Sequence, residues 1–228
     1  GNYPVGTGNV ALGDAALDDG SLSGGYNTGI GWEALTANTS GQINTAIGGK
    51  ALNSNTTGSN NVALGYGAML DNTSGSSNTG IGRGALPNNT TASENTALGY
   101  QAGYSTTTGG ANTAVGVKAL YLNTTAVANT ALGWNAAYSN TTGAFNVAIG
   151  YQSLASNTTA SQNTAVGYQA GYSNTTGISL AHFGYQAGRS NTTGDDNSFF
   201  GRSSGYSTTT GNYNTGIGRS ALALNTTA

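Results

Sequence analysis

Residues 163–179 read NTAVGYQAGYSNTTGIS, and this stretch is one copy of a unit that recurs along the whole chain. The motif Asn-Thr/Val-Ala/Gly-apolar-Gly begins a unit at Asn9, at Asn27 and then every 17 residues as far as Asn214, with Leu180 replacing Asn once. The 228 residues thus hold thirteen units, of which the first, residues 9–26, is one residue longer. We number each unit as coil positions 1 to 17. A fixed period of this kind indicates a repeat architecture.

Comparison of the copies shows which coil positions are constrained. Position 5 is always Gly, position 4 is always apolar, and position 8 is always Ala or Ser. All fourteen Asp, Glu, Lys and Arg residues fall at positions 6, 7, 10, 11, 16 and 17. Because charged side chains are rarely buried, these positions predict three solvent-facing corners. The uncharged stretches between them predict two strands, at positions 1–5 and 12–15, and a short third leg.

Helix is the competing interpretation of the repeat, and the composition argues against it. Gly, Asn and β-branched residues recur in every unit and are poor in helix interiors. Short strands joined by tight turns suit the length of the unit. We therefore predict an all-β parallel β-solenoid (β-roll) of about thirteen coils, forming a single array over residues 1–228. Residues 1–8 would be a partial coil, 9–26 an irregular first coil and 27–228 regular coils.

Asn residues recur at positions where stacked coils would bring identical amides together. Amides one strand spacing apart can hydrogen-bond along the stack as a ladder. We expect one such column at position 1, and position 13 would form a matching Thr column. The Asn-Thr-Thr runs also match glycosylation sequons, but glycans on coils only about 4.8 Å apart would collide. The second predicted ladder, at position 12, comprises Asn38, Asn55, Asn72, Asn89, Asn123, Asn140, Asn157, Asn174, Asn191 and Asn225.

The composition excludes several classes of function. Charged residues make up 6% of the chain and the net charge is −2, so no basic patch is available for nucleic acid. No apolar run approaches the roughly 20 residues that span a bilayer, so we expect no membrane insertion of this segment. Cys is absent from the sequence, which excludes disulfides and thiolate metal sites. We expect no cofactor.

The strand motifs NVALG (residues 9–13), NTAIG (44–48) and NVAIG (146–150) resemble the head repeats of trimeric autotransporter adhesins of the YadA type. The units here are longer than that family's, by an added Asn-Thr-Thr segment. The resemblance implies a left-handed parallel β-roll, three chains side by side, exposure on a bacterial surface and adhesion to host matrix or other cells. Similar repeats also look like those of phage tail-fibre shafts.

Two features favour self-association independently of that resemblance. Strand positions 2 and 4 point one way and positions 1, 3 and 5 the other, and neither face carries a charge. Such a strand is most simply buried on both faces, one inside the coil and one against a neighbouring chain. The terminal residues also look like parts of coils without caps, and open strand edges need protection. We expect a segment of a longer fibre or subunits that stack end to end.

Aromatic residues gather at two corner positions. Exposed rings could stack on sugars or anchor a host surface protein, whereas the alternative is a seam between chains, where such residues are enriched. The candidates at position 6 are Trp32, Tyr66, Tyr100, Trp134, Tyr151, Tyr168 and Tyr185, and those at position 10 are Tyr104, Tyr121, Tyr138, Tyr172 and Tyr206.

Catalytic and metal-binding residues are scarce. His182 is the only His and has no base or nucleophile beside it in the sequence, so we interpret it as part of an irregular coil with Phe199 and Phe200. Asp14, Asp18 and Asp19, and separately Asp195 and Asp196, have carboxylates suited to Ca²⁺, but their spacing matches no known calcium loop. We predict solvated corners and no metal site.

These observations predict a non-enzymatic structural or adhesive module of an extracellular fibre, at a bacterial surface or in a virion tail fibre. The alternatives are a filament that assembles end to end and an ice-binding solenoid with exposed Thr columns. Ice binding is the weaker alternative because positions 12–15 never carry charge and are expected to be buried. An enzyme would need acidic and basic residues gathered in a groove.

Overall fold

The computed structural model describes residues 7–227, so most of the predicted partial coil at residues 1–8, and Ala228, lie outside the described residues. Between residues 7 and 227 no helix long and apolar enough to cross a bilayer occurs. The regular elements are three-residue strands: β1 (Val10–Leu12), β2 (Thr28–Ile30), β3 (Thr45–Ile47), β4 (Val62–Leu64), β5 (Thr79–Ile81), β6 (Thr96–Leu98), β7 (Thr113–Val115), β8 (Thr130–Leu132), β9 (Val147–Ile149), β10 (Thr164–Val166), β11 (Ala181–Phe183), β12 (Ser198–Phe200) and β13 (Thr215–Ile217).

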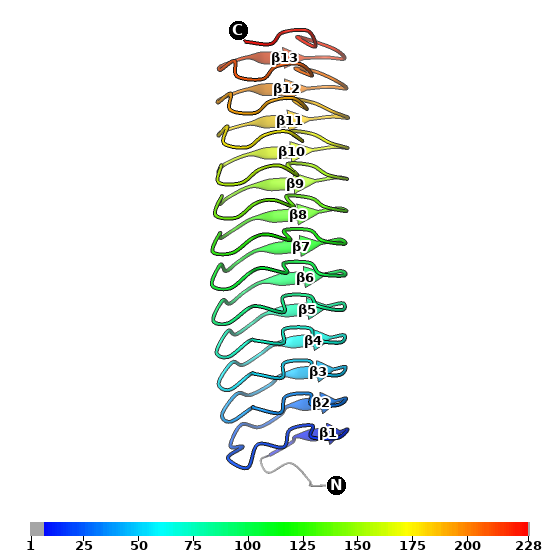
Figure 1. Cartoon of the computed structure of the whole chain (residues 1–228), viewed down its shortest axis with the longest axis vertical. Coiled ribbons are helices and arrows are strands. Elements are labelled where there is room, and N and C mark those ends of the chain that lie inside the picture. The colour runs from blue at the N-terminus through cyan, green and yellow to red at the C-terminus, as the bar shows by residue number, and fades with distance from the viewer. Residues whose placement is uncertain (1–6, 228) are drawn as a thin grey trace. The chain divides into compact units, whose positions relative to one another are not determined.

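The chain divides into two compact units, Gly1–Asn112 and Thr113–Ala228. Strands β1–β6 lie in the first unit and β7–β13 in the second, and within each unit they are parallel and follow sequence order (Figure 1). Residues 17 apart pair with each other, as Ala46 pairs with Ala63 in the first unit and Ala131 with Ala148 in the second. One sequence repeat is therefore one coil with equivalent residues in register, as predicted.

Each coil contains one strand, at positions 2–4, and not the two that we predicted. Positions 12–15 still bond to the adjacent coil: the amide of Thr56 donates to Thr73 O at 2.9 Å, and the hydroxyl of Thr56 donates to the same oxygen at 3.0 Å. The same carbonyl, Thr73 O, also accepts from the amide of Thr57 at 3.1 Å. Such shared acceptors differ from the even ladder of a parallel strand.

Left-handed backbone conformations turn the chain at recurring positions. Residues at positions 7, 9 and 17 have positive φ in coil after coil, for example Lys50 (60°), Leu52 (50°) and Asn60 (59°). Position 5 is Gly for a steric reason as well, because a Cβ on Gly65 would lie 2.7 Å from the carbonyl of Gly82 in the next coil. Gly65 also has φ of 128°, a backbone conformation that glycine adopts freely and that residues with a Cβ rarely adopt.

The apolar core of each coil is built from positions 3, 8 and 9. Position 3 is small where position 9 is large, as in the fully buried pair Ala63 and Met69. The relation is reversed where position 3 is large: a Cβ on Gly205 would lie 2.4 Å from the ring of Phe199. A coil thus holds at most one large side chain at these two positions, and in the coils that begin at Asn95, Asn129 and Asn163 both positions are Ala or Gly.

Buried Asn side chains form hydrogen bonds that connect different parts of each coil. In one coil the carbonyl of Gly58 accepts from Asn44 Nδ2 at 2.8 Å and from Asn55 Nδ2 at 3.0 Å, which joins positions 1, 12 and 15. The amides also link successive coils, since Asn55 Nδ2 donates to Asn38 Oδ1 at 2.8 Å. The predicted ladder at position 12 is therefore present, with further rungs at Asn72, Asn89, Asn140, Asn157, Asn174 and Asn191, where the donors are 2.7–3.1 Å from the amide oxygen of the preceding coil, that of Asn140 being Asn123 Oδ1. Position 12 is Thr at Thr106 and Thr208, and the prediction for Asn225 was wrong, since its amide donates to Asn214 Oδ1 at 3.3 Å.

Candidate binding surfaces

The outward face of the strands is an uncharged surface in each unit. Positions 1 and 3 point into the coil and positions 2 and 4 point out, as the alternation along a strand predicts. Position 2 is mostly Thr and half-buried, whereas position 4 is apolar and more open: Leu98 in the first unit is 44% exposed and Leu132 in the second 46%. We call positions 2 and 4 of β1–β13 the strand face. Within each unit its position 4 side chains are half-buried to exposed among the described residues 7–227.

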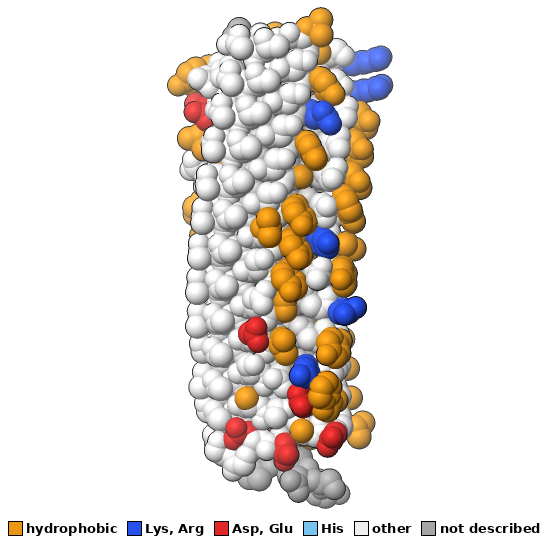
Figure 2. Space-filling model, in the orientation of Figure 1, with side chains coloured by type: hydrophobic (Ala, Val, Ile, Leu, Met, Phe, Trp, Pro, Cys, Tyr) orange, Lys and Arg blue, Asp and Glu red, His pale blue; other side chains and the backbone are white. Residues whose placement is uncertain are grey.

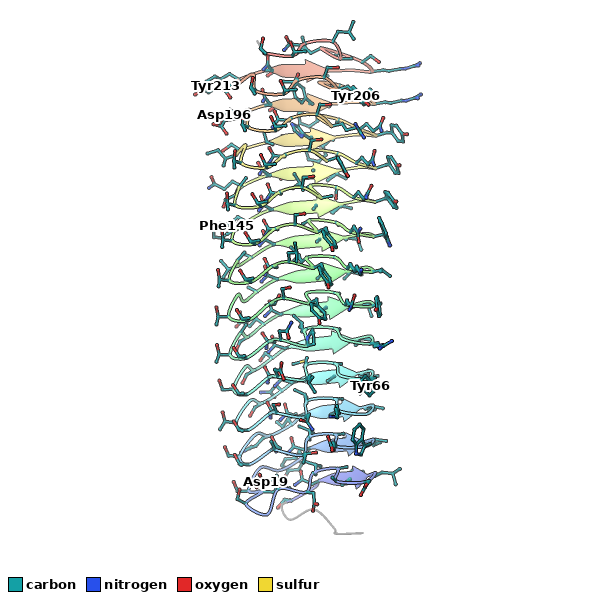
Figure 3. All side chains as sticks on the ribbon, viewed as in Figure 1. Asp19, Tyr66, Phe145, Asp196, Tyr206 and Tyr213 are labelled. Atoms are coloured by element: carbon teal, nitrogen blue, oxygen red, sulfur yellow. The ribbon has the colours of Figure 1, made fainter. Side chains whose placement is uncertain are left out.

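The aromatic residues at positions 6 and 10 lie at the surface, as predicted. The rings at position 6 are exposed by 40–53%, and those at position 10 are half-buried. Tyr66 points outward at the edge of its coil in Figure 3. Figure 2 shows hydrophobic side chains gathered in columns along the coils, beside a broad region with few of them.

In the second unit the position 6 rings stack on one another. Trp134, Tyr151, Tyr168 and Tyr185 form a continuous column with ring centroids 4.9–5.1 Å apart and planes within 12° of parallel. The faces of Tyr151 and Tyr168 are therefore covered on both sides, and only their edges meet solvent. A sugar stacks on the face of an aromatic ring, so these inner rings do not offer the surface that stacking requires. The column stabilises the contacts between coils instead.

The strip between the two aromatic columns differs between the units. In the second unit position 7 carries a Gln ladder: Gln169 Nε2 donates to Gln152 Oε1 at 2.9 Å, and Gln186 Nε2 donates to Gln169 Oε1 at 3.1 Å. In the first unit Gly67 and Gly84 occupy position 7, and a hollow of about 220 Å³ lies above them. The pattern of aromatic residues did not predict this hollow. The sequence feature that could have indicated it is the pair of glycines at position 7.

The Thr columns of the second leg are only partly buried, which corrects the prediction for positions 12–15. The hydroxyl of position 13 is held in the backbone contact between coils, as in Thr158, whose Oγ1 donates to Thr175 O at 3.2 Å. Position 14 is exposed throughout, for example at Thr57 and Thr142. The prediction treated positions without charged residues as buried. Position 14 has no charge because it holds only Ser or Thr, so its exposure was missed.

His182 is fully buried inside its coil, stacked on Phe199 with centroids 5.2 Å apart. Neither ring nitrogen has a hydrogen-bond partner. Burial lowers the pKa of His182 to about 3, so the ring is neutral. A neutral imidazole enclosed by apolar neighbours, without contact to solvent, has no substrate to act on, and it fills the space that Gly188 leaves: a Cβ there would lie 2.3 Å from its ring.

The predicted Asp clusters lie at corners. Asp14, Asp18 and Asp196 are exposed, and the hydroxyl and amide of Ser21 donate to Asp19, which lowers the pKa of that carboxyl. Over residues 7–227 no three His, Cys, Asp or Glu side chains converge as metal ligands would.

Comparison with protein-family models gives no match, and comparisons with curated proteins and with solved structures give no significant match either. The resemblance to adhesin head repeats therefore stays a prediction that depends on the strand motifs alone.

Proposed function

We propose that this chain is a non-enzymatic structural module of an extracellular fibre, in which several copies associate side by side through the strand face. The observation that carries the proposal is the column of half-buried to exposed apolar residues at position 4, next to mostly half-buried Thr and without a single charge. Exposed contiguous apolar surface of this kind is typical of protein interaction sites. The resemblance of the strand motifs to adhesin heads favours three chains and a cell-surface or tail-fibre location.

The small interior of the coil gives a second reason for association. Much of the core consists of Ala and Asn, such as Ala46, Ala63, Asn44 and Asn61, so each coil buries little apolar area of its own. At about 25 cal/mol per Å² of apolar surface, covering the strand face would add stabilisation along every coil. Domains with small cores commonly gain stability by oligomerisation.

The test compares two Lys variants within the coil of residues 129–145. Leu132→Lys places a charge on the strand face, and Thr142→Lys places one at exposed position 14 of the same coil. The proposal expects the parent and Thr142→Lys to form the same oligomer in sedimentation equilibrium, and Leu132→Lys to shift the equilibrium toward monomer, further so when combined with Leu98→Lys in the coil of residues 95–111. A parent chain that is monomeric at micromolar concentration would contradict the proposal.

Ice binding is the second candidate, and the strand face is also the observation that favours it. Position 2 places Thr hydroxyls in a regular column beside the apolar column, as at Thr113, Thr130 and Thr164 in the second unit. Parallel strands repeat every 4.7–4.9 Å, so this column is a regular array of hydroxyls and methyl groups. Thermal hysteresis that disappears in Leu132→Lys would favour this candidate over side-by-side association.

A further inference from the structure

The hollow of the first unit is bounded by two open aromatic rings and one cation. Tyr66 and Tyr100 occupy position 6 two coils apart, and Arg83 occupies position 6 of the coil between them. Because Arg83 separates the two rings, their facing sides are not covered by another ring as they are in Trp134–Tyr185 of the second unit. Both rings are well exposed, Tyr66 by 53% and Tyr100 by 42%.

The floor of the hollow is open because two residues lack side chains. A Cβ on Gly67 would meet nothing within 4 Å, and one on Gly84 would touch only Gln101 Cγ, at 3.7 Å. The opposite wall is formed by position 10, where Leu70, Pro87 and Tyr104 lie. In the equivalent strip of the second unit, the Gln ladder occupies this space.

The charge in the hollow is not neutralised by the protein. Within residues 7–227 the one ion pair joins Lys50 Nζ to Glu33 Oε2 at 3.4 Å, so Arg83 has no carboxylate partner there. Arg83 is exposed beside the hollow. A guanidinium presents a planar fork of donors that suits a carboxylate, and such pairs are among the stronger hydrogen-bonded contacts.

We propose that this hollow binds an acidic sugar unit of a glycan, with its carboxylate on Arg83 and the apolar face of its ring against Tyr66 or Tyr100. The volume of about 220 Å³ is small and open at the surface, which suits one sugar ring on a longer chain better than a folded protein segment. The remaining hydroxyl groups of the ring meet the Gln101 side chain and solvent. This site would give a fibre module an adhesive contact, and it does not depend on association through the strand face.

The test measures binding of an oligogalacturonate by calorimetry, with its fully methyl-esterified form as the ligand control. The ester keeps the ring and removes the charge, and we expect it to bind at least tenfold more weakly. Arg83→Gln should cost a similar factor. Gly84→Gln should also abolish most binding, because it fills the floor with a residue that position 7 already accepts at positive φ in Gln101 (54°). Arg202→Gln, also at position 6, should leave the affinity unchanged.

Three results would overturn the proposal: no measurable binding of the acid form, equal binding of the ester, or full affinity in Arg83→Gln and Gly84→Gln. Binding of poly-glutamate that depends on Arg83, together with oligogalacturonate binding that is unchanged when Tyr66 and Tyr100 are both replaced by Ala, would also overturn it, in favour of an acidic peptide. The oligomeric state measured on the same samples separates this site from the proposed assembly, since the site uses positions 6, 7 and 10 and the strand face uses positions 2 and 4.

Discussion

At the scale of single residues, the imidazole of His182 is fully buried with neither ring nitrogen hydrogen-bonded. Its pKa is about 3 in the folded protein, below the value near 6.5 that an exposed His has. The folded state therefore binds fewer protons than the unfolded state between these two values. Stability is unaffected above pH 6.5 and falls as the pH drops from 6.5 toward 3, by up to about 1.4 kcal/mol per pH unit.

We expect His182→Phe to remove this acid sensitivity and to raise stability at neutral pH by about 1–3 kcal/mol, because two unpartnered polar atoms are lost. Phe199 with Gly205 shows that the fold accepts Phe at position 3 opposite Gly, and Gly188 provides the same space. Thermal melting from pH 7 to pH 4 measures both effects. Parallel pH profiles for the variant and the parent would contradict the assignment of acid sensitivity to His182.

Backbone strain at the corners is the second property of single residues. Ser77, at position 17, has φ of 59° and is exposed, whereas Ser74 in the same coil is exposed without positive φ. Glycine removes the strain of a left-handed residue, about 1–2 kcal/mol, but costs about 0.5–1 kcal/mol in chain entropy. Ser77→Gly should therefore be neutral to stabilising by about 1 kcal/mol, and Ser74→Gly destabilising. Equal melting temperatures for the two variants would show that the corner stores no strain.

At the scale of the coil, positions 3 and 9 behave as one packing unit. Phe199→Ala should cost about 3–5 kcal/mol by leaving a cavity that Gly205 does not fill. Gly205→Leu alone should also destabilise, because its Cβ would lie 2.4 Å from the Phe199 ring. The double variant recreates the common pairing seen in Ala148 and Leu154 and should recover most of the loss. Denaturant unfolding of the three variants gives the coupling energy, and strictly additive losses would contradict the packing relation.

At the scale of the whole molecule, the strand face links stability to assembly. If copies cover this face, the unfolding midpoint should rise with protein concentration, because association stabilises the folded state by mass action. We expect the midpoint of Leu132→Lys combined with Leu98→Lys to be lower and independent of concentration, while that of Thr142→Lys follows the parent. Calorimetry over a hundredfold range of concentration measures this. If the midpoint of the parent does not change with concentration, its stability comes from contacts within one chain, and association through the strand face is contradicted.

The sequence by itself determined the coil. The period of 17 residues, the invariant Gly at position 5 and the sorting of charges to six positions predicted the parallel solenoid, its register and its exposed corners. The Asn ladder followed too, because residues one period apart must stack when coils are in register. These features depend only on contacts between equivalent positions, which a repeat makes visible.

Only the tertiary structure decided how the coil is filled and what it leaves open. The uncharged strand predicted one face inside the coil and one against a neighbouring chain, but not which was which; the structure places Ala131 inside and Leu132 outside. Position 9 has positive φ and, in Leu120 and its equivalents, a large buried side chain. The interior therefore has room for only a small residue at position 3 beside it. The stacked rings, the buried His182 and the open hollow beside Arg83 likewise depend on which neighbours are present one coil above and below, and composition at a single position does not specify them.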